Sequence, residues 1–314
     1  MLQQSPLRYP GGKARLGPFF GELVRTNGLC DGSYVEPFAG GAGVAIYLLL
    51  GEFVNSIYIN DIDESVCAFW RAILDHTGEF CALVQDVPLT PEEWYRQKQI
   101  FSSGPKSSGT LRFGFAMFYL NRTNRSGILN GGMIGGKKQT GKWGLDARFN
   151  RTELVQRIRR ISRYRQRIHV FNEDALAFLR YLMPMMGTRT LLYLDPPYYL
   201  KGQHLYANFY KHSDHRQIAN FVSSIKLPWV ITYDDHPVIQ SFYPGFRRSQ
   251  YSLEYSARER RNGSELMFFS QSLAIPKASP NCEHIFPAPP RRRQLRNTRE
   301  GRLDVYGSDS FTVR

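Results

Sequence analysis

The sequence of 314 residues contains few cysteines, and no two of them are close together. Cys30, Cys67, Cys81 and Cys282 are too far apart to form a Cys-x-x-Cys zinc cluster, and they suggest no disulfide framework. The sequence also lacks a signal-type apolar N-terminus and any apolar run long enough to cross a bilayer. We therefore expect a soluble, cytoplasmic protein without a metal site or a membrane partner.

Acidic residues are scarce in one part of the chain. The whole sequence has 41 Lys and Arg against 27 Asp and Glu, a net charge of +14. Between Lys106 and Arg167, 15 basic residues stand against Asp146 and Glu153 alone, a local charge of +13 that nearly equals the total. A solvated surface normally mixes both signs, so this clustering favours contacts with the phosphates of a nucleic acid. A merely solvated basic face is the alternative interpretation.

Two common nucleotide-binding signatures are also missing. The sequence has no Gly-x-x-x-x-Gly-Lys-Ser/Thr loop, and its glycine turn does not complete the Gly-x-Gly-x-x-Gly pattern of dinucleotide enzymes. What is present is an apolar strand ending at Glu36, a turn with Gly40, Gly41 and Gly43, and then a helical pattern. Glycines let the backbone approach a ligand closely, and the amides at a helix N-terminus face it. This arrangement predicts a site for a nucleotide or nucleoside cofactor.

A second predicted strand, Ser56 to Asn60, ends beside an acid. Asp61 follows about 20 residues beyond the glycine turn, where α/β nucleotide sites place the carboxylate that binds the ribose hydroxyls. For Asp61 taken alone, an equally simple interpretation is that it caps the helix predicted from Glu64 to Leu74.

A third apolar run, Leu191 to Leu194, ends abruptly in Asp195-Pro196-Pro197-Tyr198. Two prolines cannot continue a strand, and a residue before proline is confined to extended conformations, so Asp195 has little freedom. The Pro196 carbonyl is a second fixed acceptor, because Pro197 has no N–H to compete for it. Two fixed acceptors beside an aromatic ring suit a planar group that carries an exocyclic amine. The alternative is an ordinary strand end that Asp195 caps and against which Tyr198 packs.

The α/β alternation is interrupted between about residues 75 and 165. Capping boxes at Thr90 to Glu93 and at Asn150 to Glu153 predict helices there, separated by polar, glycine-rich loops. Strands then resume and close with an antiparallel pair. We expect a catalytic domain of residues 1–74 and 166–275, an inserted DNA-binding subdomain of residues 75–165, and a basic, disordered tail of residues 276–314.

Taken in order, the motifs resemble those of Dam-like, class alpha DNA adenine N6-methyltransferases. They are Arg8-Tyr-Pro-Gly-Gly-Lys13, Val35-Glu-Pro-Phe-Ala-Gly-Gly-Ala-Gly43, Asn60-Asp61, Tyr119-Leu-Asn-Arg122 and Asp195-Pro-Pro-Tyr198. The resemblance covers roughly residues 5–275 and is sparse in the insert. It implies an α/β fold, namely a Rossmann-like S-adenosylmethionine-dependent methyltransferase sheet with an inserted, mainly helical target-recognition subdomain.

The resemblance also implies roles for particular residues. Asp195 and the Pro196 carbonyl would accept hydrogen bonds from the target N6 amine, and Tyr198 would stack on the flipped base. The cofactor, S-adenosylmethionine, would have its carboxylate end held by Tyr9 and Lys13, its ribose by Asp61 and its adenine amine by Asp174. Its methionine part would lie among Glu36, Gly40, Gly41 and Gly43, and Phe38 would also bind the cofactor.

From the basic insert we expect contacts with double-stranded DNA. The candidate residues are Arg122, Asn124, Arg125, Lys137, Lys138 and Lys142. The sequence lacks the Pro-Cys context of cytosine C5 methylation and the motifs of zinc deaminases. Methylation of cytosine N4 or of RNA stays open as an alternative, as does a catalytically silent DNA-binding protein of the same fold. The sequence also leaves open the recognition sequence, the oligomeric state and a cognate restriction or defence component.

Overall fold

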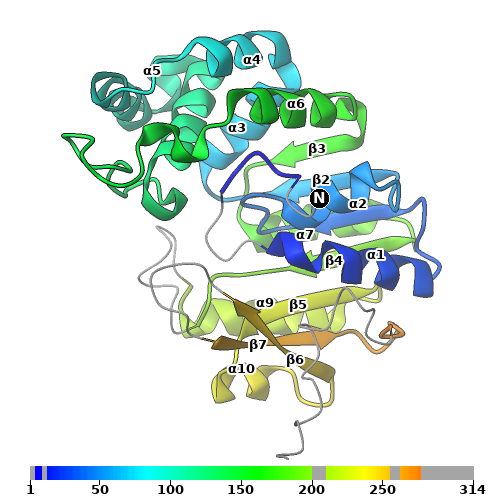
Figure 1. Cartoon of the computed structure of the whole chain (residues 1–314). Coiled ribbons are helices and arrows are strands. Elements are labelled where there is room, and N and C mark those ends of the chain that lie inside the picture. Colours follow the sequence, from blue (N-terminus) through cyan, green and yellow to red (C-terminus); the bar gives the residue numbers. More distant parts are fainter. Residues whose placement is uncertain (1–3, 9–12, 200–209, 255–261, 277–314) are drawn as a thin grey trace, which may run out of the picture.

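Seven strands form one sheet in the computed structural model, which describes residues 4–8, 13–199, 210–254 and 262–276 (Figure 1). They are β1 (Ser33–Glu36), β2 (Ser56–Asn60), β3 (Ile168–Phe171), β4 (Thr190–Leu194), β5 (Trp229–Asp234), β6 (Arg247–Glu254) and β7 (Asn262–Phe269). Their order across the sheet is β3-β2-β1-β4-β5-β7-β6. The strands β1 to β5 pair in parallel, whereas β7 runs antiparallel to β5 and β6. The predicted α/β sheet and its closing antiparallel pair are confirmed.

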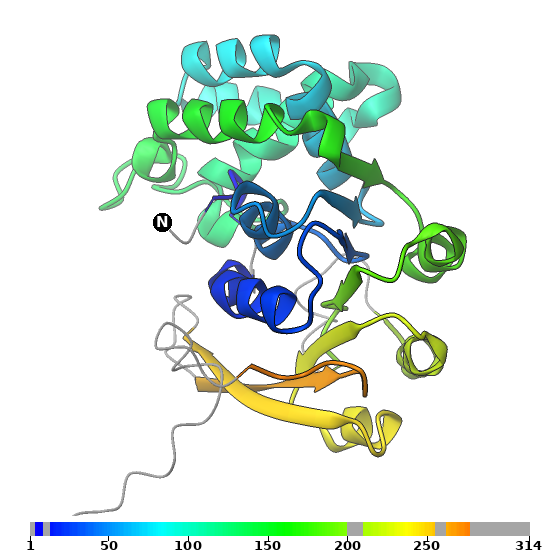
Figure 2. The same ribbon diagram turned by 90° about the vertical axis from the view of Figure 1, so that its right-hand side faces the viewer.

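Helices cover both faces of this sheet (Figure 2). One face carries α1 (Gly17–Thr26), α2 (Gly43–Leu50) and α3 (Glu64–Asp75), and the other carries α7 (Ala175–Leu182), α9 (His212–Ser224) and α10 (Pro237–Phe242). Along β4 the side chains alternate between the two cores: Leu191 and Tyr193 pack in the first, Leu192 and Leu194 in the second. Because both faces are covered, this strand is apolar throughout, as the sequence indicates.

A helical insert lies between β2 and β3 and packs on α3 (Figure 1). It contains α4 (Thr77–Asp86), α5 (Pro91–Thr123) and α6 (Arg151–Ser162), with the 3-10 turns η2 (Arg125–Gly127) and η3 (Leu145–Arg148). The backbone of α5 leaves the helical region at Gly104 and Gly109, with φ angles of 75° and 73°, where the sequence predicts a loop. Further along, α5 approaches α3 so closely that a Cβ at Gly114 would lie 2.6 Å from the Ala68 carbonyl oxygen.

The insert shares one hydrophobic core with the sheet. Phe69 of α3 packs in the same cluster as Phe80 of α4, Phe118 of α5 and the β2 residues Ile57 and Ile59. The rings of Phe69 and Phe118 stack with centroids 5.7 Å apart and planes 10° apart. The division of the chain into a catalytic domain and an inserted subdomain stays a prediction, and this packing shows that the two parts are joined by a continuous apolar interface.

Both predicted capping boxes begin helices. The Thr90 hydroxyl accepts the Glu93 N–H at 3.3 Å, and the Asn150 amide oxygen accepts the Glu153 N–H at 3.1 Å. The remaining short turns are η1 (Lys13–Leu16), η4 (Arg165–Arg167) and η5 (Met183–Met185). Within the described ranges, no helix is long and apolar enough to cross a membrane. Apart from Pro276, the predicted tail lies outside the described residues.

Candidate active site

The carboxyl ends of the parallel strands gather acidic side chains at one edge of the sheet. Glu36 ends β1, Asp61 follows β2, Asp195 follows β4 and Asp234 ends β5. Glu265 of β7 joins them because it pairs with Asp234 in the antiparallel register. In open α/β sheets a ligand binds outside the carboxyl ends of the strands, where the strand order reverses. That point lies between β1 and β4, so Glu36 and Asp195 flank it.

Lys13 supplies a positive charge to this acidic edge. Its amine lies 3.0 and 3.1 Å from the two carboxylate oxygens of Asp195, and 3.4 Å from a carboxylate oxygen of Glu265. The same amine donates a hydrogen bond to the Tyr198 hydroxyl at 2.9 Å. The Lys13 side chain is only 4% exposed, and a buried ammonium group needs fixed negative partners. The structure therefore places Lys13 on the carboxylate of Asp195, which differs from its predicted contact with the carboxylate of the cofactor.

The charges of Lys13 and Asp195 stabilise each other. Burial by itself would lower the pKa of Lys13, but the carboxylates of Asp195 and Glu265 outweigh burial and raise that pKa well above its usual range. Burial raises the pKa of Asp195, while Lys13 opposes this shift. Lys13 therefore stays charged, and it favours the ionised form of Asp195 that an amine needs as an acceptor.

Thr232 of β5 fixes one oxygen of Asp195. Its hydroxyl donates to Asp195 Oδ1 at 2.7 Å and lies 3.0 Å from the Tyr193 hydroxyl. The contact arises because β4 and β5 are parallel neighbours that reach the same edge together. The Asp195 carboxylate is thus restrained through its backbone by Pro196 and through its side chain by Thr232.

Glu265 is a site residue that sequence reasoning missed. It is 2% exposed and accepts hydrogen bonds from the hydroxyls of Tyr198 and Tyr251, the latter at 2.6 Å. Together with its contact to Lys13, these bonds connect Glu265 to Asp195. A signal was present in the sequence, because an acid directly before the apolar run Leu266 to Phe269 needs a partner if that strand is buried.

Tyr198 is held in this network by its hydroxyl. The residue is 6% exposed, and the Lys13 amine lies 5.0 Å from the centroid of its ring. Tyr198 lies beside Asp195, because both contact the same amine. Stacking of the Tyr198 ring on a target base stays a prediction, as does the contact of the Pro196 carbonyl with the target amine.

Glu36 offers an unused acceptor close to the glycine turn. It is buried, and its Oε2 atom has no hydrogen-bond partner among the described residues. Burial, with the nearby charge of Asp195, raises the pKa of Glu36 well above its usual range. A buried acceptor without a partner is costly, so this atom indicates a ligand that carries a donor.

The glycine turn, which follows Glu36 in the chain, contributes backbone groups to this part of the site. Gly40 and Ala42, on either side of Gly41, each have a φ of 46°, in the left-handed region that favours glycine. Ala42 is the N-cap residue of α2 and provides no side-chain hydrogen bond to it. A hydrogen bond from the Ala45 backbone, in the first turn of this helix, instead favours the ionised form of Glu36. Gly43 lies against η1, where a Cβ would come within 2.9 Å of the Ala14 Cβ.

The Asp61 side chain is bound to the backbone of the glycine turn. Its Oδ2 atom accepts the Gly40 N–H at 2.8 Å, and its Oδ1 atom accepts the Asp63 N–H at 2.9 Å. Burial raises the pKa of Asp61 to about 6. The capping interpretation is wrong for Asp61, because α3 is capped by Asp63, which accepts the Ser65 N–H at 2.9 Å. Asp61 therefore belongs to the turn, where a ribose was predicted.

Phe38 and Asp174, the other predicted cofactor residues that the structure describes, have partners within the protein. Phe38 packs edge-to-face on Tyr210, with ring centroids 5.7 Å apart. Asp174 caps α7, since its Oδ1 atom accepts two backbone amides of that helix, each at 3.0 Å. Contacts of Phe38 and Asp174 with the cofactor stay predictions. Tyr9 lies outside the described residues.

Asn124, a predicted DNA contact, is fully buried. Its amide oxygen accepts the indole N–H of Trp94 at 2.7 Å, and its amide nitrogen donates to the carbonyls of Ile128 and Leu129, each at 2.9 Å. A polar residue in a basic loop can therefore fold the loop instead of facing solvent. This placement corrects the expectation, because the Asn124 side chain is occupied within the protein.

Arg122 is half-buried within a cluster of arginines. Burial and the like charges of Arg8 and Arg157 lower the pKa of Arg122 to about 9. Its Nε atom is buried and has no hydrogen-bond partner in the described part of the chain. Arg148 adds a further positive charge, and Glu153 pairs with Arg157. A cluster with this excess of positive charge suits an anion such as a DNA phosphate.

The remaining predicted DNA contacts lie on the surface. Arg125 is exposed in η2, and Lys137, Lys138 and Lys142 are exposed in the loop that follows. The DNA contacts of these four residues stay predictions.

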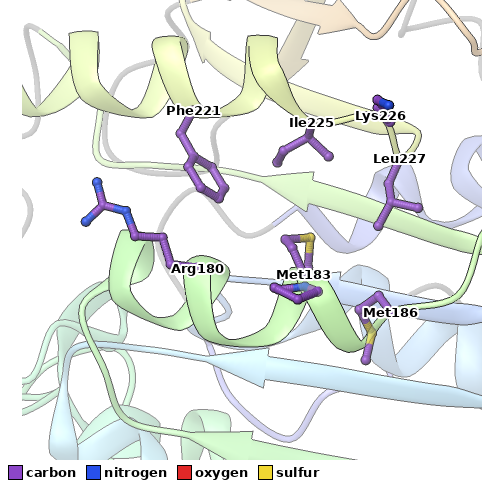
Figure 3. Close-up of a pocket in the computed structure, with 8 residues that line it drawn as sticks. Arg180, Met183, Met186, Phe221, Ile225, Lys226 and Leu227 are labelled. Atoms are coloured by element: carbon purple, nitrogen blue, oxygen red, sulfur yellow. The ribbon is translucent and has the colours of Figure 1, made fainter.

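The groove in Figure 3 is a separate feature. It lies between α7 and α9 and is lined by side chains that include Arg180, Met183, Phe221 and Ile225. These side chains belong to the ends of helices that lead into the amino ends of β4 and β5. The groove is therefore at the edge of the sheet opposite Asp195, and it is not the candidate active site.

The sheet order, with parallel strands and helices on both faces, defines a Rossmann-like α/β fold. A solved structure of an S-adenosylmethionine-dependent methyltransferase from Agrobacterium tumefaciens matches at 11% identity and a TM-score of 0.39, covering 82% of this chain and 62% of that chain, which is less than two thirds of its length. The rRNA methyltransferase aviRa from Streptomyces viridochromogenes matches at 9% identity and a TM-score of 0.36, covering 81% of this chain and 84% of that chain. No curated protein matches the sequence significantly.

The sequence itself identifies the family. Residues 9–256, well over half of the chain, match the D12 class N6 adenine-specific DNA methyltransferases. The chain belongs to this family, as the ordered motifs predict.

The cofactor of such a methyltransferase is S-adenosylmethionine, and the residues present fit it. The unpaired Oε2 atom of Glu36 suits the cofactor's amino group. The backbone at Gly40 gives close access, and Asp61 places a carboxylate beside that backbone, where ribose hydroxyls can donate to it.

Proposed function

We propose that this protein binds double-stranded DNA, turns a target adenine out of the duplex and methylates its N6 amine. The observation that carries the proposal is the Asp195 carboxylate, which Lys13 and Thr232 fix at the end of β4, beside β1 and Glu36. The base must leave the duplex, because the N6 atom is otherwise stacked and paired.

An adenine amine is a poor nucleophile, because its lone pair is delocalised into the ring. Two acceptors, Asp195 and the Pro196 carbonyl, can each accept one amine hydrogen and favour a tetrahedral nitrogen, which localises the lone pair. S-adenosylmethionine supplies an electrophilic methyl group when bound. The protein contributes positioning and a fixed electrostatic environment, and no covalent enzyme intermediate is needed.

Lys13 has two consequences for this step. It favours the ionised form of Asp195, since its positive charge opposes the effect of burial on the pKa of that carboxyl. It also occupies both oxygens of Asp195, at 3.0 and 3.1 Å, so an incoming amine must share or replace one of these contacts. Glu265 offers Lys13 a second carboxylate, at 3.4 Å, that can hold it during such an exchange.

The basic insert and the catalytic carboxylate are within reach of one DNA molecule. Arg8 is tied to the insert, because its N–H donates to the Asn121 side chain at 2.8 Å and its carbonyl accepts from that side chain at 2.7 Å. Lys13 is tied to Asp195 and is five residues further along the chain. Five residues span at most about 18 Å. The arginine cluster around Arg122 therefore lies near enough to hold phosphates beside a flipped base.

Transfer of labelled methyl groups from S-adenosylmethionine to unmethylated DNA, followed by nucleoside analysis of the product, tests the proposal. We expect the label in N6-methyladenine. Label in N4-methylcytosine, or transfer to RNA alone, would replace the proposed substrate. No transfer to any DNA by a folded protein that binds the cofactor would overturn the proposal.

A further inference from the structure

Trp143 is unusual among the tryptophans of this chain. Its side chain is 64% exposed, whereas Trp70, Trp94 and Trp229 are 1%, 4% and 1% exposed. A single exposed apolar side chain is common on protein surfaces and needs no explanation by itself. The loop around Trp143 provides the further observations.

This loop, residues 134–145, is held together from inside. The Gln139 amide donates to the carbonyls of Ile134 and Gly136 at 2.9 and 2.7 Å, and its oxygen accepts the Leu145 N–H at 3.1 Å. Its two arms pass so closely that a Cβ at Gly135 would lie 2.8 Å from the Trp143 carbonyl oxygen. The exposure of Trp143 is therefore a property of an ordered loop, which lowers the entropy cost of using the ring in binding.

The same loop carries three exposed lysines. They are Lys137, Lys138 and Lys142. The Lys142 amine lies 5.7 Å from the centroid of the Trp143 ring, so a positive charge accompanies the aromatic surface. Proteins that hold unpaired nucleic-acid strands combine these two features, with basic groups on the phosphates and aromatic rings on the bases.

We propose that Trp143 stacks on a nucleobase of the DNA substrate that loses its stacking partner when the adenine is extruded, while the neighbouring lysines contact phosphates. The inference rests on the proposed function, because it is the extrusion of a base that exposes such a surface. An indole ring covers a base of any identity, so this contact adds affinity without adding a base-specific hydrogen bond.

The inference can be tested by intrinsic fluorescence. The other three tryptophans are buried, so acrylamide quenching of the wild-type protein reports mainly on Trp143. Saturation with unmethylated plasmid fragments should quench its emission and protect it from acrylamide. Dextran sulfate, a polyanion without bases, should bind the lysines and leave Trp143 accessible. Equal protection by dextran sulfate or by anionic lipid vesicles would overturn the assignment to a nucleobase.

Variants separate stacking from charge. Trp143→Ala should weaken DNA binding by roughly tenfold and leave the salt dependence unchanged, because it removes a ring and no cation. Trp143→Phe keeps an aromatic face and should restore most of the affinity. Lys142→Ala should instead reduce the salt dependence. Wild-type affinity in Trp143→Ala, with unchanged thermal stability as the folding control, would overturn the inference.

Failure of the stacking inference can be distinguished from failure of the proposed function. A protein that protects Trp143 on DNA but transfers no methyl group contradicts the methyltransferase proposal alone. A protein that methylates DNA while Trp143 stays accessible to acrylamide contradicts the stacking inference alone.

Discussion

The edge of the sheet at Asp195 and the lysine-bearing loop of residues 134–145 use charge in opposite ways. At the edge, Lys13, Asp195 and Glu265 are buried or nearly so, and each contacts at least one of the others. In the loop, Lys137, Lys138 and Lys142 are exposed, and none of them forms an ion pair in the described residues. Charges in a buried network depend strongly on one another, whereas exposed charges are screened by solvent and salt and act nearly independently.

The difference between buried, paired charges and exposed charges matters for function. The edge needs a carboxylate in one fixed position and one protonation state, so a network that restrains both is useful. The loop needs to follow phosphates on a mobile polyanion, so separate, solvated cations suffice. The predictions that follow test this contrast, beginning with the largest expected effect.

Asp195→Asn should reduce methyl transfer by about 10³-fold or more, because the variant keeps the shape of the side chain but loses the charged acceptor at the reacting amine. Cofactor affinity, measured by isothermal titration calorimetry, should stay within about threefold. The matched control is Asp86→Asn, which removes the same charge from an exposed position on α4. Loss of cofactor binding together with activity would indicate misfolding and would contradict a purely catalytic role for Asp195.

Lys13→Met should both destabilise the protein and change its pH dependence. It leaves the carboxylates of Asp195 and Glu265 without their ammonium partner, which should cost about 3–5 kcal/mol in denaturant unfolding near neutral pH. Lys13 normally lowers the pKa of Asp195, so its removal raises that pKa. Activity should fall as the pH drops below the pKa of Asp195. In Lys13→Met this fall should therefore occur at a higher pH than in the wild type.

Unfolding curves and pH–rate profiles of Lys13→Met can be compared with those of Lys98→Met. Lys98 is exposed and lies over the Trp94 ring, so its replacement should change stability by at most about 1 kcal/mol. An acid limb at the same pH in Lys13→Met and the wild type would contradict the proposed coupling.

Asp61 should make cofactor binding sensitive to mildly acidic pH. Its pKa is raised to about 6, so the ionised form that accepts ribose hydroxyls dominates above this value and is lost below it. We expect the affinity for S-adenosylmethionine to fall on acidification through about pH 6. In Asp61→Asn, binding should be about tenfold weaker at high pH, the effect of one lost charge-assisted hydrogen bond, and the transition near pH 6 should disappear. Persistence of that transition in the variant would contradict its assignment to Asp61.

Lys137→Ala should have the smallest effect. One fewer phosphate contact should weaken DNA binding a few-fold at moderate salt and reduce the slope of log affinity against log salt by about one. Lys138→Ala should behave in the same way, and the double variant should give the sum of the two changes because exposed charges act independently. An unchanged slope in the double variant would show that this loop does not contact phosphates.

Local patterns were enough to predict the fold and the main motifs. The strand ends at Glu36 and Leu194 follow from apolar runs that stop at a turn or shortly before proline, and the caps at Thr90 and Asn150 depend on residues three apart. The closing antiparallel pair is equally local, since its two strands are neighbours in the sequence. Such features need no knowledge of distant parts of the chain.

Contacts between distant residues were not predictable in this way. Lys13 and Asp195 are 182 residues apart, and Glu265 meets Tyr198 across 67 residues, so only the assembled sheet brings them together. The error at Asn124 has the same origin, because its partner Trp94 lies near the other end of α5, 30 residues earlier in the chain. Polarity predicts that a residue needs partners, but it does not say whether protein or DNA supplies them.

The central claim is that Asp195 enables methylation of adenine N6 in DNA. The most direct measurement is sequencing that maps methylated adenines in a bacterial host without adenine methylation of its own, expressing either the wild-type protein or Asp195→Asn at equal levels. We predict N6-methyladenine at one short sequence with the wild type and none with the variant. No methylated adenine with a folded wild-type protein, or the same methylation pattern with both proteins, would contradict the claim.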